Sequence, residues 1–303
     1  MTGRDMTTYS ETPRFDAAFD LHRIMRRRMG VPPPLADRIV RRVNRFWNAS
    51  RAELRRRNMP GVEGLHIPDE DGYLLLPPGM LPGSEAALAV CRDLFAQTRA
   101  TWSGPDPKST KDFLISLVRD GGFARHPEIL RFLISPTVLA SVSRYLGGVP
   151  RLSTVRLWWT PPNDSMERSQ VWHIDPEDTR QLKLFLNVFE IDAEQGPFTF
   201  CPASASRPLL KKAGIRQRHF EDAAVAAAGE PIVLTGPAGS GAFIDTSRCV
   251  HFGSRGNRRD RVVLMAQYTD FYAPGVRAAS WAKAVNEAGL SLSPPEKLAL
   301  CVE

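Results

Sequence analysis

The pattern of hydrophobic and polar positions divides the chain into two parts. From Val149 onward, short apolar or alternating runs are separated by Gly, Pro, Asp and Ser, which is the pattern of β-strands joined by turns. Seven or eight strands of this length predict a β-sandwich or a jelly roll. The runs are RLSTVRLWWTPP, QVWHID, QLKLFLNVFEI, PFTFCPA, PIVLTG, SGAFIDT and DRVVLMAQYTDFYAP.

The part before Val149 follows a helical period. Between residues 31 and 58, apolar side chains recur at the spacing of one helix face, with arginines between them. We expect this face to pack on the main body, and the arginines to point to solvent or to a partner. The apolar positions are Leu35, Ile39, Val43, Phe46 and Trp47.

Two further segments precede the strand-rich part. Residues 71–95 predict a short strand, a Pro/Gly turn and a helix, and residues 110–147 predict a helical stretch that ends at the glycines of YLGG. Helices first and strands afterwards indicate an α+β chain. We expect a double-stranded β-helix core (jelly-roll, cupin-like), with helices from the N-terminal part packed on it.

The composition is that of an ordinary globular protein, with 43% hydrophobic and 24% charged residues. No apolar run approaches the roughly 20 residues that span a bilayer, and the N-terminus lacks the basic and apolar regions of a secretory signal. The four cysteines are scattered without CxxC pairs, which favours a reducing compartment. We therefore expect a cytoplasmic protein with no transmembrane segment.

The formal net charge is +7, and much of the excess comes from arginines within residues 23–57. Such a segment could contact nucleic acid, a membrane surface or an anionic partner. Charge runs are more often solvated helix faces, so we do not expect nucleic acid as the partner. An anionic small molecule is compatible with this charge, whereas the oligomeric state cannot be read from the sequence.

The run QVWHID places His173 and Asp175 two positions apart in a predicted strand, so both side chains project from the same face. Two interpretations compete: a structural hydrogen-bonded pair, or two ligands of a metal. His251 also lies in the predicted sheet beside bulky apolar residues. Two histidines and one carboxylate form the facial triad of non-haem Fe(II) oxygenases, although an HxD motif alone is more often a chance match.

The surroundings of His251 strengthen the metal interpretation. It follows a Gly-rich turn and an Asp-Thr pair, and Arg261 comes ten residues later at the start of an apolar strand. A dicarboxylate cosubstrate needs a fixed cation for its far carboxylate, and the planar fork of arginine provides two parallel hydrogen bonds. Arg259 shares the predicted face, but Arg261 adjoins the strand core and is the first candidate.

Other side chains are weaker candidates. Lys183 alternates with leucines in QLKLFLN and either reaches an anionic ligand inside the barrel or extends to solvent. Trp158 and Trp159 occupy opposite faces of one strand, so at most one of them, Trp158 by our assignment, contacts substrate. Gln170 and Ser206 are candidate contacts at the mouth of the pocket.

These motifs resemble the phytanoyl-CoA dioxygenase-like family of Fe(II)/2-oxoglutarate oxygenases. The likeness spans roughly residues 65–272, and we divide the chain into a basic helical N-terminal extension (1–62), an oxygenase jelly-roll domain (63–275) and a C-terminal tail packed on that domain (276–303). It rests on WHID, GPFTFCPASASR, FIDTSRCVHFG and RVVLMAQY, with DGYLLLPPG and YLGG in addition.

The resemblance implies a site and a reaction. Fe(II) would be held by His173, Asp175 and His251, and 2-oxoglutarate would chelate the iron and pair with Arg261. O2 would be consumed with release of succinate and CO2, and a small-molecule substrate would usually be hydroxylated. Related halogenases replace the carboxylate ligand, whereas this chain keeps it. The run CPASASR departs from the Pro-Gly-Ser-His type turn of many relatives, which leaves the substrate open.

Two other classes of function stay open at this point. A cupin-like metalloenzyme without 2-oxoglutarate would have no need for the arginine beside the strand core. A polyanion-binding protein would use the arginine-rich helix, with the barrel only as a platform, and would bind in a strongly salt-dependent manner.

Overall fold

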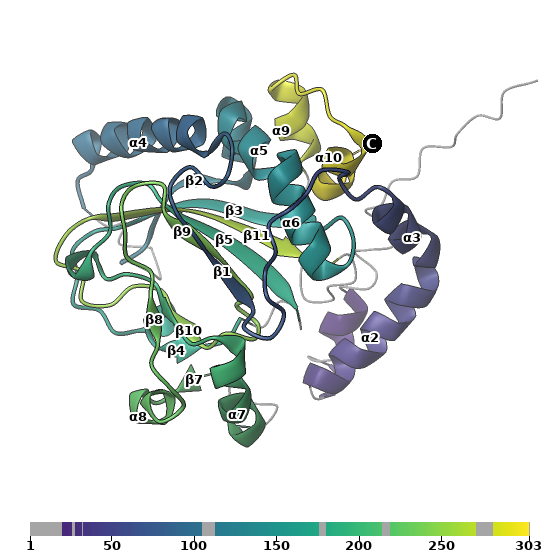
Figure 1. The fold of residues 1–303 in the computed structure, drawn as a ribbon, viewed down its shortest axis with the longest axis horizontal. Coiled ribbons are helices and arrows are strands. Elements are labelled where there is room, and N and C mark those ends of the chain that lie inside the picture. The colour runs from purple at the N-terminus through teal and green to yellow at the C-terminus, as the bar shows by residue number, and fades with distance from the viewer. Residues whose placement is uncertain are drawn as a thin grey trace, which may run out of the picture.

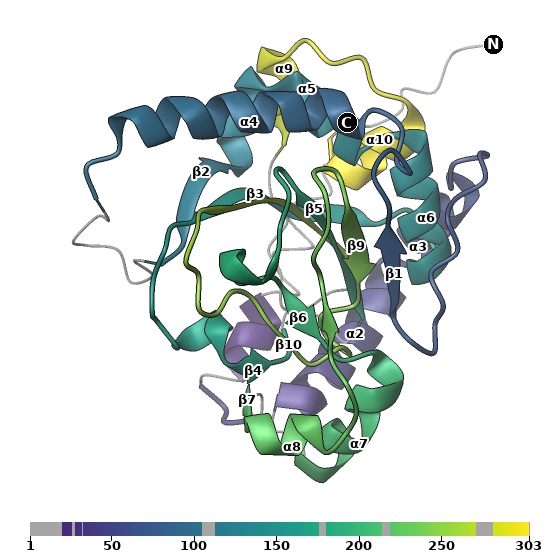
Figure 2. The ribbon, with the colours of Figure 1, turned by 60° about the vertical axis from the view of Figure 1, so that its left-hand side comes forward.

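The computed structural model describes residues 20–25, 28–31, 33–104, 113–175, 180–213, 219–270 and 281–302. In this part of the chain, two antiparallel sheets face each other across a common interior (Figure 1, Figure 2). The major sheet has six strands in the order β1-β9-β5-β11-β3-β2, and the minor sheet has five in the order β7-β4-β10-β6-β8. The jelly-roll core predicted from the strand pattern is confirmed.

The strands of the two sheets differ in length, and the long central strands of the major sheet form the frame of the domain. The major sheet contains β1 (Tyr73–Leu76), β2 (Ile115–Arg119), β3 (Arg151–Thr160), β5 (Gln181–Asn187), β9 (Gly241–Ile244) and β11 (Arg261–Thr269). The minor sheet contains β4 (Trp172–His173), β6 (Thr199–Phe200), β7 (His219–Phe220), β8 (Ile232–Val233) and β10 (His251–Phe252).

Helices precede, interrupt and follow these strands. The α-helices are α2 (Pro33–Trp47), α3 (Ala49–Arg57), α4 (Ser84–Thr101), α5 (Pro127–Leu133), α6 (Pro136–Leu146), α7 (Ala203–Ala213), α8 (Asp222–Ala226), α9 (Ala282–Glu287) and α10 (Pro294–Leu300). The 3-10 turns are η1 (Asp120–Arg125), η2 (Arg168–Gln170) and η3 (Ala193–Gln195). Within the described residues, no single helix has the length and apolar character to cross a membrane; α5 and α6 reach them only when taken together, across a 41° bend.

The central strands of the major sheet alternate between two environments. On β5, Leu182, Leu184 and Leu186 belong to the buried cluster beneath the helices, whereas Lys183 and Phe185 line the space between the sheets. Successive side chains of an extended strand point to opposite faces. The alternation in QLKLFLN therefore predicts correctly which side chains face the helices and which face the space between the sheets.

Helices α4, α5 and α6 lie over the outer face of the major sheet (Figure 1). They contribute Leu88, Ile129 and Leu133 to the same buried cluster as the outward leucines of β5. At the C-terminal end, α9 contacts η1, and α10 contacts β3 and α6. The outer face is thus closed by helices, and the inner face remains available for a site.

The continuous helical stretch predicted for residues 110–147 is wrong in its first third. There, β2 adds an edge strand to β3, with Ile115 opposite Trp159 and Arg119 opposite Arg156, and η1 follows. The helical part is two helices, α5 and α6, each with a proline in its first turn. The open edge of β3 explains the difference, because strand pairing outweighs a local helical period.

The apolar face predicted for residues 31–58 does not pack on the main body. The segment forms two helices. The buried residues of α2 lie next to the predicted face and not on it: Ala36, Val40 and Asn44. Ala36 and Val40 form a small cluster with Met25. Of the five predicted contacts, Val43 is half-buried, and the other four are between 37% and 83% exposed: Leu35, Ile39, Phe46 and Trp47.

Arg55 on α3 corrects the expectation that the arginines of this segment point to solvent. Its side chain is buried and donates hydrogen bonds to the carbonyl oxygens of Val149 (2.9 Å), Pro150 (3.1 Å) and Leu298 (2.8 Å). A guanidinium with several donors can satisfy loop carbonyls that no strand pairs. Arg55 therefore fastens α3 to the start of β3 and to α10.

The close approach of β9 to β5 at Gly241 predicts the effect of a substitution on stability. A Cβ added to Gly241 on β9 would lie 2.0 Å from the carbonyl oxygen of Phe185 on β5. Gly241→Ala should lower the free energy of unfolding by about 3 kcal/mol, because the two strands must move apart. Urea denaturation of the metal-free protein measures the change.

Gly61→Ala is the matched control, because a Cβ at Gly61 meets nothing within 4 Å. It should stay within about 0.5 kcal/mol of the parent protein. Equal stability of the two variants would contradict the pairing of β9 with β5 in this register.

Candidate metal centre

The minor sheet brings His173 and His251 together. In the antiparallel pair β4–β10, the two residues lie directly opposite each other, so their rings project from the same face, with centroids 4.3 Å apart. Asp175 follows β4, and its backbone N–H donates to the carbonyl oxygen of Thr246 at 2.9 Å. Residues 78 positions apart in sequence therefore converge on one point, as the metal interpretation requires.

The ligand atoms of these three residues all lie within 4.8 Å of one another. Nε2 of His173 is 3.8 Å from Oδ1 of Asp175, and Nε2 of His251 is 3.6 Å from Oδ2. Among the described residues, this is the group of histidine, cysteine or carboxylate side chains with the spacing to hold a metal ion.

The tautomers of both histidines suit metal binding. Nδ1 of His173 lies 2.8 Å from the carbonyl oxygen of Val171, and Nδ1 of His251 lies 2.8 Å from that of Cys249. A carbonyl oxygen only accepts, so each Nδ1 carries the proton and each Nε2 presents a lone pair to the centre. The backbone thereby orients both rings before any ligand arrives.

The charge states fit a divalent cation. Burial lowers the pKa of His251 to about 3 and also lowers the pKa of His173, although Asp175 opposes both shifts. Burial alone would raise the pKa of Asp175, but the Lys183 ammonium and the two imidazoles hold it well below its usual range. At neutral pH the site is therefore two neutral imidazoles and one carboxylate, the ligand set of the non-haem Fe(II) facial triad.

A cavity of about 270 Å³ opens onto the triad. Its wall is largely apolar, with Trp158, Phe185, Val263 and Met265 from the major sheet and Phe198 from the segment before β6. The ring of Phe198 stacks on that of His251 at 5.2 Å. Apolar walls exclude water and strengthen electrostatic interactions inside the cavity.

Arg261, the first residue of β11, lines the same cavity. Its side chain is 6% exposed, and burial lowers its pKa to about 10, so the guanidinium stays charged at neutral pH. The structure gives this guanidinium no hydrogen-bond or ion-pair partner among the described residues, and its buried Nε is unsatisfied. A buried cation without an anion is costly, so the cavity fits a ligand that carries a carboxylate.

Lys183 and Trp158, two of the weaker candidates, also line the cavity. The Lys183 side chain is 13% exposed and does not extend to solvent; its Nζ lies 2.6 Å from Oδ2 of Asp175. Trp158 faces the cavity, whereas Trp159 is fully buried on the opposite face, where its Nε1 donates to Asp260. The opposite orientation of the two tryptophans is as predicted.

The structure does not bring Arg259, Gln170 or Ser206 to the cavity. Arg259 is half exposed and pairs with Asp192 at the surface. Gln170 is buried, and its side chain donates to Asn163 and accepts from the backbone of Glu167. Both side chains therefore have partners outside the cavity.

Ser206 has a structural role next to the site. Its Oγ donates to the carbonyl oxygen of Cys201 (3.2 Å) and accepts from the backbone N–H of Val250 (2.9 Å). It thus fixes the residue before His251 and does not line the cavity.

The sequence analysis did not single out His219. It lies in β7 opposite His173, with ring centroids 6.4 Å apart, so His219, His173 and His251 form a row on one face of the minor sheet. A strand of two residues carries no periodicity that could reveal it.

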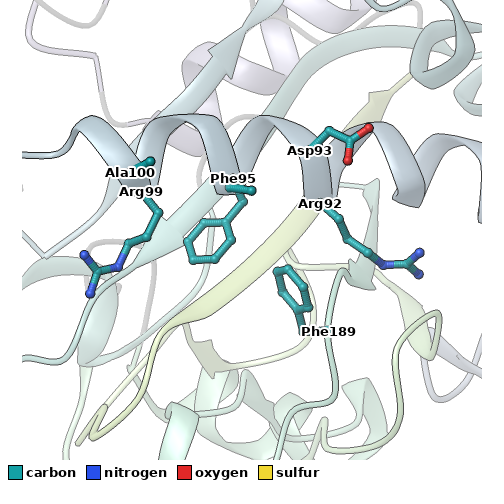
Figure 3. Close-up of a pocket in the computed structure, with 7 residues that line it drawn as sticks. Arg92, Asp93, Phe95, Arg99, Ala100 and Phe189 are labelled. Atoms are coloured by element: carbon teal, nitrogen blue, oxygen red, sulfur yellow. The ribbon is translucent and has the colours of Figure 1, made fainter.

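A wider groove lies on the outer side of the domain, between α4 and the end of β5. Figure 3 shows Phe95 and Phe189 facing each other there, with Arg92 and Arg99 on either side. Arg92 pairs with Glu85, and Arg99 pairs with Asp260, so these cations are already matched. The described residues of the groove include no ligand set for a metal, and the triad cavity is the candidate site.

No family model matches the chain, and no curated protein matches it. Solved structures do. EctD from S. alaskensis in its apoform is 19% identical, with 77% of this chain and 84% of that one covered, at a TM-score of 0.52. EctD from S. alaskensis with 2-oxoglutarate and 5-hydroxyectoine is 16% identical (71% and 81%, TM-score 0.50). The epimerase SnoN in complex with Fe3+, alpha ketoglutarate and nogalamycin RO is 20% identical (73% and 83%, TM-score 0.48).

At these identities, the likeness to EctD establishes the fold. This chain has the jelly-roll architecture of EctD over about three quarters of its length. The chemistry of the site has to be argued from the residues that this chain itself places there.

The triad predicts one divalent metal per chain. His173→Ala should weaken the binding of Co(II), measured anaerobically by calorimetry, more than about 100-fold, since loss of a direct ligand costs more than loss of a supporting hydrogen bond. His219→Ala is the matched control, because it removes the neighbouring imidazole of the same row, and it should bind Co(II) within about threefold of the parent. Equal losses in both variants would argue against a site built on His173.

Proposed function

We propose that this protein is an Fe(II)/2-oxoglutarate-dependent oxygenase of the phytanoyl-CoA dioxygenase-like kind, acting on a small organic molecule. One observation carries the proposal: a two-histidine, one-carboxylate set opens onto a cavity that also contains a buried arginine, to which no described side chain supplies an anion. The first feature suits non-haem iron, and the second suits the distal carboxylate of a dicarboxylate cosubstrate.

The comparison with EctD supports the cosubstrate. One of its structures was determined with 2-oxoglutarate and 5-hydroxyectoine, so the same fold accommodates 2-oxoglutarate in that protein. We extend the cosubstrate to this chain because Arg261 provides the matching cation. We do not extend the substrate, because function depends on the loops and side chains of the site and not on the fold.

The residues divide the work of binding and orientation. Bound together, Fe(II) and 2-oxoglutarate supply an oxidant, with O2 consumed and succinate and CO2 released. His173, Asp175 and His251 hold the metal through orientations that the backbone fixes. Arg261 anchors and orients the cosubstrate, and the apolar wall that includes Trp158 keeps water from the reacting atoms.

A cupin-like metalloenzyme without 2-oxoglutarate is the main alternative, and Arg261 argues against it. Such an enzyme would bury an unmatched guanidinium beside its metal with no compensating anion, at a considerable cost in free energy. Hydroxylation of the substrate, like the cytoplasmic location, stays a prediction, because desaturation or ring formation would use the same ligands and differ only in how the substrate lies.

The proposal predicts a selective effect of Arg261 on cosubstrate binding. Under anaerobic conditions, Fe(II) and 2-oxoglutarate should give the visible charge-transfer band of their chelate. Arg261→Ala should bind 2-oxoglutarate about 100-fold more weakly, because two charge-assisted hydrogen bonds are lost. Titration of the band measures the change.

Arg259→Ala is the matched control, because it removes an arginine that pairs with Asp192 outside the cavity; its titration should match that of the parent. Metal binding without any band would favour the cupin-like alternative. Absence of both metal binding and the band would mean that His173, Asp175 and His251 have only a structural role in the sheet.

A further inference from the structure

Lys183 lines the cavity and makes a contact that the proposed function does not use. It projects from β5 on the major sheet, opposite Gln267 of β11 and Ile244 of β9. Its ammonium crosses the interior to Asp175, which belongs to the segment after β4 on the minor sheet. The Nζ–Oδ2 distance is 2.6 Å, and the two side chains are 13% and 11% exposed.

The two oxygens of Asp175 have different surroundings. Oδ2 accepts from Lys183 and lies 3.6 Å from Nε2 of His251. Oδ1 lies 3.8 Å from Nε2 of His173. The ammonium therefore occupies one oxygen of the carboxylate and leaves the other on the side of His173.

We propose that Lys183 is a positioning residue that holds Oδ2 of Asp175, so that the carboxylate offers a metal one oxygen and not two. This inference rests on the proposed function, because it concerns the metal of the same site. A carboxylate that binds through one oxygen uses one coordination position, which leaves three for a chelating cosubstrate and O2 in a facial triad.

The same contact has a second consequence for the metal-free protein. A buried carboxylate without a cation is destabilising, and Lys183 supplies that cation when no metal is bound. When a metal does bind, the ammonium becomes a like charge beside it. Lys183 thus keeps the ligand in place at the expense of metal affinity.

The main test is metal affinity in the absence of 2-oxoglutarate. Lys183→Met removes the charge and keeps the length of the side chain. It should bind Co(II) at least tenfold more tightly, because the bound metal is no longer repelled by the ammonium at low dielectric and because Oδ2 of Asp175 becomes available to it. This gain should exceed the entropic cost of ordering the Asp175 side chain, which Lys183 no longer holds. The visible spectrum of bound Co(II) should change as well, since its ligand set changes.

Two variants control this measurement. Lys211→Met makes the same substitution at an exposed position of α7 and should leave Co(II) affinity within twofold of the parent. Lys183→Arg keeps a donor cation near Asp175 and should restore affinity close to that of the parent. If Lys183→Met binds Co(II) like the parent and instead loses 2-oxoglutarate about 100-fold, Lys183 contacts the cosubstrate and the inference is overturned.

A thermal cycle on the metal-free protein tests the Lys183–Asp175 contact itself. Lys183→Met should lower Tm by about 5 °C, because it leaves a buried charge unmatched. In the Asp175→Asn background the same substitution should leave Tm unchanged or raise it, since the ammonium is there a buried charge without its carboxylate. Equal losses in both backgrounds would show that Lys183 acts only through packing and would overturn the inference.

Failure of the inference and failure of the proposed function give different results. If the parent protein and His173→Ala both fail to bind Co(II), the metal site itself is absent. If the parent binds Co(II) and Lys183→Met leaves both affinity and spectrum unchanged, the metal site stands and the positioning role falls.

Discussion

The pairing of β10 with β4 is the contact on which the candidate site depends, because it sets His251 opposite His173. A shift of one residue would turn one imidazole to the other face of the minor sheet. The outward face resists such a shift, since Trp172 and Phe252 pack edge to face there, with centroids 4.6 Å apart. Two strands of two residues each therefore hold a fixed register through aromatic packing on one face and a ligand pair on the other.

The charged groups enclosed in the cavity are the second constraint on the structure. Among the described residues, the cavity encloses the Asp175 carboxylate and the cations of Lys183 and Arg261 within a mostly apolar wall. Lys183 neutralises the carboxylate, whereas Arg261 has no partner among the described side chains. A low-dielectric enclosure makes the matched pair strong and the unmatched charge costly. The major sheet tolerates this arrangement because its long central strands are buried on both faces, with leucines beneath the helices and the charged groups toward the interior.

Much of the fold followed from local pattern. The alternation along QLKLFLN and the apolar run RVVLMAQY predicted two of the strands, and the opposite orientation of Trp158 and Trp159 followed from the period of two. Pattern failed where an element depended on its neighbours. Residues 115–119 became a strand because β3 had an open edge to pair. Helix α2 buried Ala36 and Val40 in a small cluster with Met25, whereas Phe46 stays exposed.

For the site, the sequence by itself determined which residue types were available: an HxD pair on one strand, a later histidine in a strand-like run, and an arginine beside an apolar core. These are local properties of chemistry and spacing. Only the tertiary structure decided which groups meet, because meeting depends on strand register and on which face of a sheet is enclosed. It placed His251 against His173, kept Arg259 at the surface with Asp192, added His219 to the row of histidines, and joined Lys183 to Asp175 across two sheets, a contact that no sequence spacing encodes.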